Sequence, residues 1–379
     1  MRTESLPRPA RIPPGLRRLR STYRAGSTPV SRLLLRLRDD SQFLRTTVQA
    51  AFALLCVWIG VEFYFFYRWG VSTEGAPLSP RPPGAEGFLP ISALISLKYF
   101  LLTGIINNIH PSGLFILLAI LAVSLVLKKA FCSWLCPIGT LSESLWMLGR
   151  KLFGRNITLP RWLDYPLRSL KYLMMGFFVW SVATMDAAGL AGFIYSPYNK
   201  VADIKMYLFF AEIGGAALWT VTILVVFSVV IRNFWCRYLC PYGALLGIAG
   251  LLSPLKITRT ASTCIDCNLC TKVCPSGIQV HRLTRVRSDE CTSCMACVEA
   301  CPVKETLGVR APLIRRAVPA WMFGALVAGI FVAVTGLGIM TGHWQNGISP
   351  AEYQRRIQQI DAPIYNHFRG HVPEYGPND

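Results

Sequence analysis

The chain has 379 residues, of which 53% are hydrophobic and 16% are charged, and its mean hydropathy is +0.40. Soluble domains carry about 25% charged residues, so the composition excludes an ordinary soluble enzyme. The excess of 39 Lys and Arg over 20 Asp and Glu also excludes an acidic disordered chain. The 13 Cys residues occur on a chain too long to be a small disulfide-stapled module, which favours a membrane protein that binds metal through thiolates.

The first 45 residues are basic and contain several prolines, and we expect residues 1–45 to form a disordered cytoplasmic leader. Its arginines could contact anionic lipid or nucleic acid, but a positive flank of a membrane helix is the simpler explanation, so we predict no nucleic-acid partner. Five hydrophobic runs then approach or exceed the length of about 20 residues that a membrane-spanning helix needs. They are Thr46–Tyr67, Ser112–Leu127, Ser169–Leu190, Tyr207–Ile231 and Ala317–Met340. The second run is short, but Lys128 and Lys129 could snorkel from its end.

A sixth run, Phe88–Ile106, contains Lys98 and is interrupted at Gly104, so it could be a sixth span or a re-entrant helix. The distribution of basic residues favours the re-entrant interpretation. If this run does not cross, 31 of the 39 Lys and Arg residues fall on one side of the membrane, which identifies that side as cytoplasmic. We therefore predict five crossings in the bacterial inner membrane, with the N-terminus cytoplasmic and the C-terminus periplasmic.

An internal repeat links two of these helix ends. Residues 124–139 read SLVLKKAFCSWLCPIG and residues 228–243 read SVVIRNFWCRYLCPYG. Each copy is the end of an apolar helix followed by a basic residue, an aromatic residue and the motif C-x-x-x-C-P-x-G. Two copies in one membrane orientation predict a parallel structural repeat of a helix and a cysteine elbow.

The motif C-x₂-C-x₂-C-x₃-C-P occurs twice, beginning at Cys264 and at Cys291. This spacing binds [4Fe–4S] clusters in bacterial ferredoxins, where the fourth Cys of each motif ligates the other cluster. The pattern predicts one cluster on a first cysteine set, Cys264, Cys267, Cys270 and Cys301. It predicts another on a second cysteine set, Cys274, Cys291, Cys294 and Cys297. Zinc sites use pairs of cysteines rather than two runs of four, and disulfides are rare on the cytoplasmic side.

Four further cysteines lie in the two elbows: Cys132, Cys136, Cys236 and Cys240. They could bind a third [4Fe–4S] cluster or Cu(I), they could form a redox-active dithiol pair, or they could only pack. Cys56, alone in the first span, is expected to be a core residue. Because C-x-x-C-H is absent and no histidine is centred in a clear span, we find no pattern for a haem. Electrons would then remain near the cytoplasmic face, pass to a quinone, or cross through a partner.

Ionisable residues near the membrane are candidate quinone or proton sites. The carboxylates Glu62, Asp186 and Glu212 lie near helix ends, where simple exposure to the interface is the favoured explanation, and Lys98 and His110 are treated in the same way.

The two elbows and the double ferredoxin motif together resemble the membrane-bound polyferredoxin family, which includes NapH, the C-terminal half of NosR, and CcoG. The resemblance covers roughly residues 46–310. It implies a mainly α, polytopic membrane protein with a small cytoplasmic α+β module of the bacterial 2[4Fe–4S] ferredoxin type. We expect a membrane domain over 46–255, the ferredoxin-like domain over 256–312, a last transmembrane helix over 313–340 and a periplasmic tail over 341–379.

The resemblance also implies electron transfer between the quinone pool and a redox partner protein through two [4Fe–4S] clusters. No catalytic acid–base or nucleophile arrangement is evident, so the chain would act as a subunit, such as part of a quinol dehydrogenase. Two alternatives belong to other classes: a cytoplasmic-side copper reductase or assembly factor for a metalloenzyme, and a redox-sensing regulator.

Overall fold

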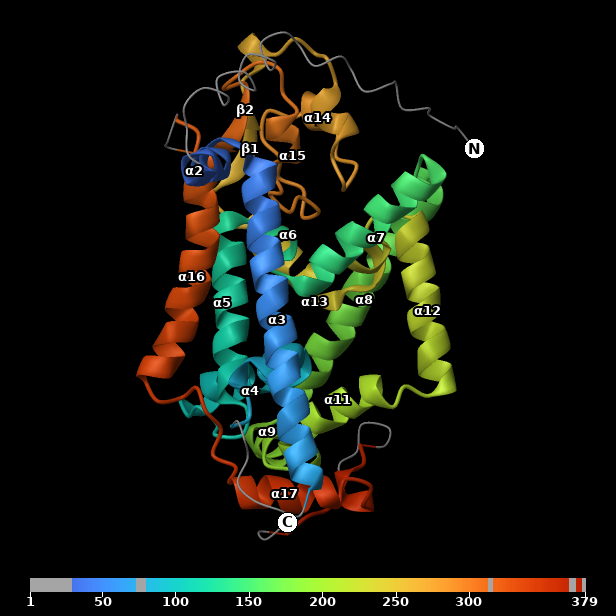
Figure 1. Cartoon of the computed structure of the whole chain (residues 1–379), viewed down its shortest axis with the longest axis vertical. Helices are drawn as coiled ribbons and strands as arrows, with labels where there is room; N and C mark the ends of the chain where they lie inside the picture. Colours follow the sequence, from blue (N-terminus) through green and yellow to red (C-terminus); the bar gives the residue numbers. More distant parts are fainter. Residues whose placement is uncertain (1–28, 73–79, 313–315, 368–372, 377–379) are drawn as a thin grey trace.

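The computed structural model describes residues 29–72, 80–312, 316–367 and 373–376. The described chain is mainly helical, with one two-stranded sheet at one end of the molecule and helix α17, Pro350–Gln358, at the opposite end (Figure 1). We call these the cluster end and the tail end. Residues 1–28 of the predicted leader lie outside the described part. The predicted disorder is wrong for the rest of the leader, because Pro29–Asp39 forms helix α2 and helix α3 begins at Ser41.

Among the described residues, two helices are long and apolar enough to cross a membrane unaided: α3, Ser41–Val71, and α16, Ala320–Met340. At 1.5 Å per residue, the 31 residues of α3 span about 46 Å. Its N-terminus is capped by Asp40, whose carboxylate accepts hydrogen bonds from the N–H groups of Gln42 and Phe43. Helix α5, Pro111–Leu127, is apolar on all sides but has only 17 residues, and it packs against α16.

Two of the predicted spans are bent rather than continuous. Helix α8, Arg161–Thr184, meets α9, Ala187–Ile194, at 108°, and α11, Ala202–Ala211, meets α12, Gly215–Val230, at 77°. The predictions of continuous helices over Ser169–Leu190 and Tyr207–Ile231 are therefore wrong. Hydropathy does not detect these breaks, because apolar residues continue through them while Asp186 caps a new helix and Gly214 begins another. If each bent pair counts as one span, the described residues contain up to four.

The predicted sixth run forms a short helix, α4, Pro90–Thr103, which ends at Gly104 in the left-handed conformation. Its 14 residues extend about 21 Å, less than the bilayer core of about 30 Å. The end of α3 and the beginning of α5 lie at the same end of the molecule, so the segment between them returns to the side on which it started (Figure 1). This arrangement agrees with the interpretation that the run does not cross.

The sequence repeat is also a repeat in structure. In the first copy, α5 leads into α6, Phe131–Trp134, and then α7, Pro137–Phe153. In the second copy, α12 leads into a π-helical turn, Trp235–Leu239, and then α13, Pro241–Leu251. Helix α7 in the first copy and helix α13 in the second begin directly after the last Cys of the motif.

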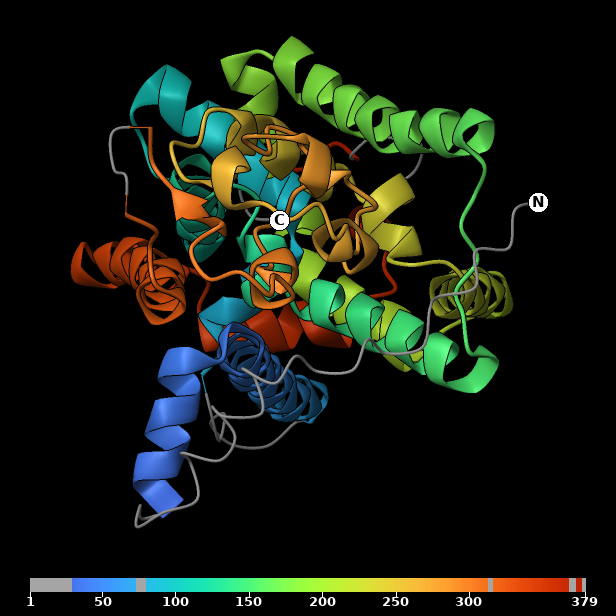
Figure 2. The same ribbon diagram turned by 90° about the horizontal axis from the view of Figure 1, so that it is seen from above.

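The cluster end carries strands β1, Lys256–Arg259, and β2, Leu307–Arg310, which pair antiparallel with Ile257 opposite Val309. Helices α14, Leu269–Lys272, and α15, Ala296–Glu299, lie between the strands in sequence. Seen from above, this module covers the centre of the helical bundle, and α2 projects away from it (Figure 2). The remaining short elements are Pro83–Phe88 (η1), α10, Pro197–Lys200, Ala261–Thr263, Val280–Arg282 and Pro363–Tyr365.

Two hydrophobic cores divide the molecule along its length. The first contains Ile120 and Leu127 of α5 together with Ile257 and Met295 of the ferredoxin-like module, so module and bundle share one core. The second lies at the tail end and joins Phe66 of α3 to residues of α17. There, a Cβ added to Gly70 would lie 2.3 Å from Cδ1 of Ile357, which shows how closely the two helices approach.

Candidate iron–sulfur sites and the cavity beside them

The two ferredoxin motifs adopt the same backbone conformation. Asp266 and Asn268 of the first motif have φ of 49° and 60°, and the equivalent Ser293 and Met295 of the second have 50° and 58°. Left-handed residues at matching positions are uncommon for non-glycine residues. Two related cluster-binding loops are expected to share such a backbone conformation, and these two loops share it.

Each predicted cysteine set surrounds its own small cavity. The first is lined by all four cysteines of the first set, and the second by all four cysteines of the second set. Each includes the fourth Cys of the other motif, which is the crossed arrangement that the spacing predicts. The sets differ in position: Cys267 of the first set is exposed, as is its neighbour Ile265, whereas the second set lies against the membrane helices.

The electrostatics of these thiols suit residues that would hold a metal. Burial and the adjacent Cys294 thiol raise the pKa of Cys274 to about 12, although backbone N–H groups of Ile278 and Ser276 act in the opposite direction. A buried thiol becomes a thiolate only where a cation compensates its charge, and cluster iron would supply that charge. Among the described residues, no three His, Cys, Asp or Glu side chains are grouped for a single metal ion. A cubane differs because each thiolate binds a different iron atom, so its ligands surround the cluster.

The four elbow cysteines, Cys132, Cys136, Cys236 and Cys240, are brought together by the repeat and line one cavity. Cys136 and Cys240 are N-caps of α7 and α13, where their sulfur atoms accept hydrogen bonds from Gly139 N–H at 3.4 Å and Gly243 N–H at 3.3 Å. In the first elbow, close approach requires the glycine: a Cβ on Gly139 would lie 2.1 Å from the carbonyl oxygen of Cys132, whereas a Cβ on Gly243 would lie 3.4 Å from that of Cys236.

A buried cation, Lys129, lies beside the elbow cysteines. Burial raises the pKa of Cys132 to about 11 and that of Cys236 to about 12, while the Lys129 ammonium opposes both shifts. The expectation that Lys128 and Lys129 snorkel to the surface is wrong, since their exposed fractions are 1% and 4%. The ferredoxin-like module covers the end of α5 and encloses both side chains. The described residues provide no hydrogen-bond partner for Nζ of Lys128, which lies near Cys291.

The cavity at the elbow cysteines has a volume of about 690 Å³. One end is lined by polar residues of the elbows, and the rest is lined by apolar residues of α3, α5 and α16, such as Leu55, Ile120 and Phe331. Cys56, expected to be a core residue, lies on its wall, and Cys294 of the second set also contributes. The cavity therefore adjoins the elbow cysteines and the second cysteine set. No sequence pattern indicated it, because its wall is assembled from helices far apart in the chain.

Hydrogen bonds hold the ferredoxin-like module on the membrane helices. The Gln42 side chain donates to the carbonyl oxygen of Cys294 at 2.9 Å, and the Ser133 hydroxyl donates to that of Thr292 at 2.7 Å. The indole N–H of Trp134, between the first two elbow cysteines, donates to Ser293 at 3.2 Å. These bonds connect the cluster-binding loop directly to an elbow.

Two of the other ionisable residues that the sequence offered as candidate proton or quinone sites, Lys98 and Asp186, form hydrogen bonds within the protein. The Lys98 ammonium donates to carbonyl oxygens at the end of α8, at 3.1 Å for Val182 and 2.9 Å for Ala183. The Asp186 carboxylate caps α9 by accepting the N–H of Gly189 at 2.8 Å. Glu212 is exposed at the end of α11.

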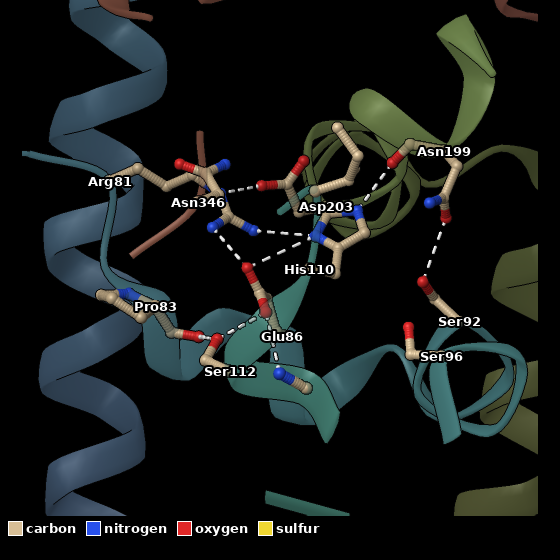
Figure 3. A network of polar contacts seen from close by, with 12 residues as sticks. Arg81, Pro83, Glu86, Ser92, Ser96, His110, Ser112, Asn199, Asp203 and Asn346 are labelled. Atoms are coloured by element: carbon tan, nitrogen blue, oxygen red, sulfur yellow. Dashed lines mark hydrogen bonds and ion pairs between the residues drawn. The ribbon is translucent and has the colours of Figure 1, made fainter. Parts of the chain in front are cut away.

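His110 belongs to a buried ionic network at the tail end (Figure 3). Glu86 lies 2.8 Å from Arg81 and accepts the N–H of Gly113 at 2.8 Å, and Arg81 also pairs with Asp203. His110 donates from Nε2 to the carbonyl oxygen of Asn199 at 2.7 Å, and its Nδ1 lies 3.4 Å from Glu86. Burial alone would raise the pKa of Glu86, but the charge of Arg81 and the hydrogen bonds outweigh it and lower that pKa to about 2.

Comparison with known proteins gives both parts of the chain a family match. One family model, a 4Fe-4S binding domain, matches residues 109–156 and again 213–260, which are the two halves of the repeat. A second model, a 4Fe-4S dicluster domain, matches residues 256–302.

Among relatives, the chain is 46% identical over 328 residues to YccM of Escherichia coli (strain K12), a candidate electron transport protein by its name, with 85% of this chain and 91% of the relative covered. It is 33% identical over 194 residues to the regulatory protein NosR of Pseudomonas aeruginosa, covering 48% of this chain and 25% of NosR. The ferredoxin-type protein NapH of Escherichia coli is 26% identical over 183 residues, covering 46% and 59%. No solved structure matches.

Proposed function

Since this chain belongs to the NapH- and NosR-like ferredoxin-type membrane proteins with 4Fe-4S binding domains, we propose that it transfers electrons between the quinone pool and a redox partner protein. The observation that carries the quinone link is the cavity of about 690 Å³ between α3, α5, α16 and the two elbows. An apolar wall with a few polar groups at one end suits a lipid-soluble ring with a hydrocarbon tail.

The residues that would hold the cofactors are the two cysteine sets of the ferredoxin-like module, one [4Fe–4S] cluster on each. The elbow cysteines would hold a third cluster. Its support is the convergence of four half-buried cysteines on one cavity wall beside the buried Lys129, because a thiolate-ligated cluster is anionic and a buried cation stabilises it. Such clusters accept and release single electrons, which is the only chemistry that the relay requires of them.

The order of the sites follows from their positions. The cavity adjoins the elbow cysteines, Cys294 of the second set shares its wall, and the first set lies farthest out with Cys267 exposed. Electrons from a quinol would enter at the elbows, and the partner protein would bind beside the first set. The reverse direction uses the same path.

For the membrane orientation we propose five crossings, made by α3, α5, α8, α12 and α16, in the bacterial inner membrane. The proposal rests on the alternating directions of these helices in Figure 1 and on the excess of basic residues at the cluster end. The clusters would then be cytoplasmic and the segment after α16 periplasmic. Cysteine accessibility to a membrane-impermeant reagent, with single cysteines placed at Thr341 and Lys304, tests both sides.

Iron and acid-labile sulfide analysis of the whole chain, purified without oxygen, tests the cofactor assignment. Three cubanes give about 12 iron atoms per chain and two give about 8. Changing the four elbow cysteines to Ser should lower the iron from about 12 to about 8 and remove one EPR signal. About 8 in both proteins would contradict a third cluster.

The quinone link needs a separate measurement. Addition of a short-tailed quinol to the oxidised protein should reduce the clusters within the mixing time, and the elbow variant should lose this reduction. If the quinol leaves all clusters oxidised while dithionite reduces them, the proposed donor is wrong. Stoichiometric Cu(I) binding that depends on the elbow cysteines would instead favour the copper-handling alternative, and reversible loss of clusters in oxygen without turnover would favour the regulator.

A further inference from the structure

The two elbows differ at several positions of the cavity wall, and one of these lies inside the motif C-P-x-G. After Cys-Pro, the first copy of the repeat has Ile138 and the second has Tyr242, and both residues line the cavity wall. The repeat therefore places a hydroxyl group on one side of the cavity and a hydrocarbon on the equivalent side. The cysteine, proline and glycine of this motif are identical in the two copies.

The hydroxyl of Tyr242 has no hydrogen-bond partner among the residues that the structure describes, and its half-buried side chain lies near Cys132, Cys136 and Cys240. The two most deeply buried of the described tyrosines are paired within the protein. Tyr238 donates to Asp164 at 2.6 Å, and the hydroxyl of Tyr353 accepts from Asn346 at 2.6 Å. A phenol that lines a cavity and has no partner in the protein is free to donate to a molecule bound there.

Two of the charged groups nearby are already paired. Glu143 is held by two hydrogen bonds of 2.7 Å from Arg45, and Arg237 donates to Asp164 at 3.1 and 3.0 Å. The ammonium of Lys129 lies close to Cys132 and Glu290. Among the neutral donors on the cavity wall, Tyr242 is the one that lies inside the motif C-P-x-G, near Cys132, Cys136 and Cys240.

We propose that Tyr242 is the residue that recognises the ring of the bound quinone, donating its O–H to one carbonyl oxygen while Ile138 packs against the ring. A quinone carbonyl is an acceptor without a donor of its own, so it complements a phenol that has no other partner. When the ring is a quinol, the phenol oxygen accepts the O–H of the ligand instead. The inference rests on the proposed function and assigns the polar contact within that cavity.

The test uses the whole chain with its clusters intact, and the probe is decylubiquinone. Its binding is measured by quenching of tryptophan fluorescence, since Trp235 and Trp344 line the same cavity. Tyr242→Phe should weaken binding about 5- to 10-fold, which corresponds to one buried hydrogen bond. The matched control is Tyr198→Phe, which removes the same hydroxyl from a tyrosine that does not line the cavity and should bind as the wild type does. Iron content establishes that both variants are folded.

A second measurement separates recognition from a merely structural role. Infrared difference spectra with ¹³C-carbonyl-labelled quinone should show one carbonyl band at lowered frequency in the wild type, and this band should return to the free value in Tyr242→Phe. Unchanged binding and an unchanged band in the variant would overturn the inference, and a shift only in the potential of the elbow cluster would assign the hydroxyl to a sulfur atom instead. Absence of binding to the wild type would overturn the proposed quinone site itself.

Discussion

The two ends of the molecule bury polar groups in different ways. At the tail end, Arg81, Glu86 and Asp203 compensate one another, and His110 completes the network. At the cluster end, the ammonium of Lys128 and the side-chain oxygen of Asn268 are buried without a hydrogen-bond partner among the described residues, and burial raises the pKa of the Cys274 thiol to about 12. A complete network indicates a structural role, whereas an incomplete one indicates where a cofactor or ligand binds.

Removal of the clusters should produce the largest difference in stability between the two ends. Because the module shares its core with α5, extraction of iron with a chelator under reducing conditions should unfold residues 256–312 and loosen the elbows. The cores at the two ends are separate, so the tail end should remain protected. Hydrogen exchange read by mass spectrometry distinguishes the two ends, and equal loss of protection at both would contradict their independence.

The ionic network should be the largest stabilising feature of the tail end. Arg81→Met leaves Glu86 and Asp203 without their cation, and removing one partner of a buried ion pair costs about 3–5 kcal/mol. Thermal unfolding in detergent should show a marked loss for this variant and little change for Arg355→Met, because Arg355 is exposed on α17. Iron content should not change in either protein. A loss of iron in Arg81→Met would show that the ends are coupled.

The same network should respond to acid in a defined range. The pKa of Glu86 is lowered from 4.5 to about 2, so its contribution to stability is complete above about pH 4.5 and is lost as the pH falls toward 2. The difference corresponds to about 3 kcal/mol. The protection factors of residues 83–88, which correct for the intrinsic pH dependence of exchange, should therefore fall over this range in the wild type and be largely independent of pH in Glu86→Gln. Glu212→Gln should behave like the wild type.

A smaller effect should distinguish the two buried lysines of the cluster end. Lys129→Met removes a cation beside the elbow cysteines and should lower the potential of their cluster by about 50 mV, equivalent to about 1 kcal/mol for one electron. Lys128→Met is the matched control, because Lys128 lies near Cys291 and should affect the cluster of the second set. EPR-monitored redox titration measures both. Equal shifts of all clusters would argue against these local assignments.

Much of what could be predicted came from the spacing of cysteines within short segments of the chain. The intervals between Cys264 and Cys274, and between Cys291 and Cys301, specify which cysteines can share a cavity, because a short loop can place them in few arrangements. The elbows could be predicted in the same way, since C-x-x-x-C-P-x-G places a Cys at the helix N-cap. In the first copy it also places a Gly where a carbonyl oxygen approaches. Each of these features lies within a dozen residues of chain.

The features that sequence did not reveal depend on contacts between distant segments. The bends between α8 and α9 and between α11 and α12 follow from packing at the tail end, and hydropathy continues through both. From sequence, Lys128 and Lys129 resemble snorkelling residues, but in the folded chain the ferredoxin-like module covers them. The cavity and the missing partner of Tyr242 exist only because α3, α5, α16 and both elbows meet. By itself, the sequence determined the cluster type, the repeat and the membrane class, since these depend on short-range spacing and composition. The tertiary structure decided which groups are buried, which are paired and where a ligand can bind, since these properties belong to surfaces that form only when remote residues come together.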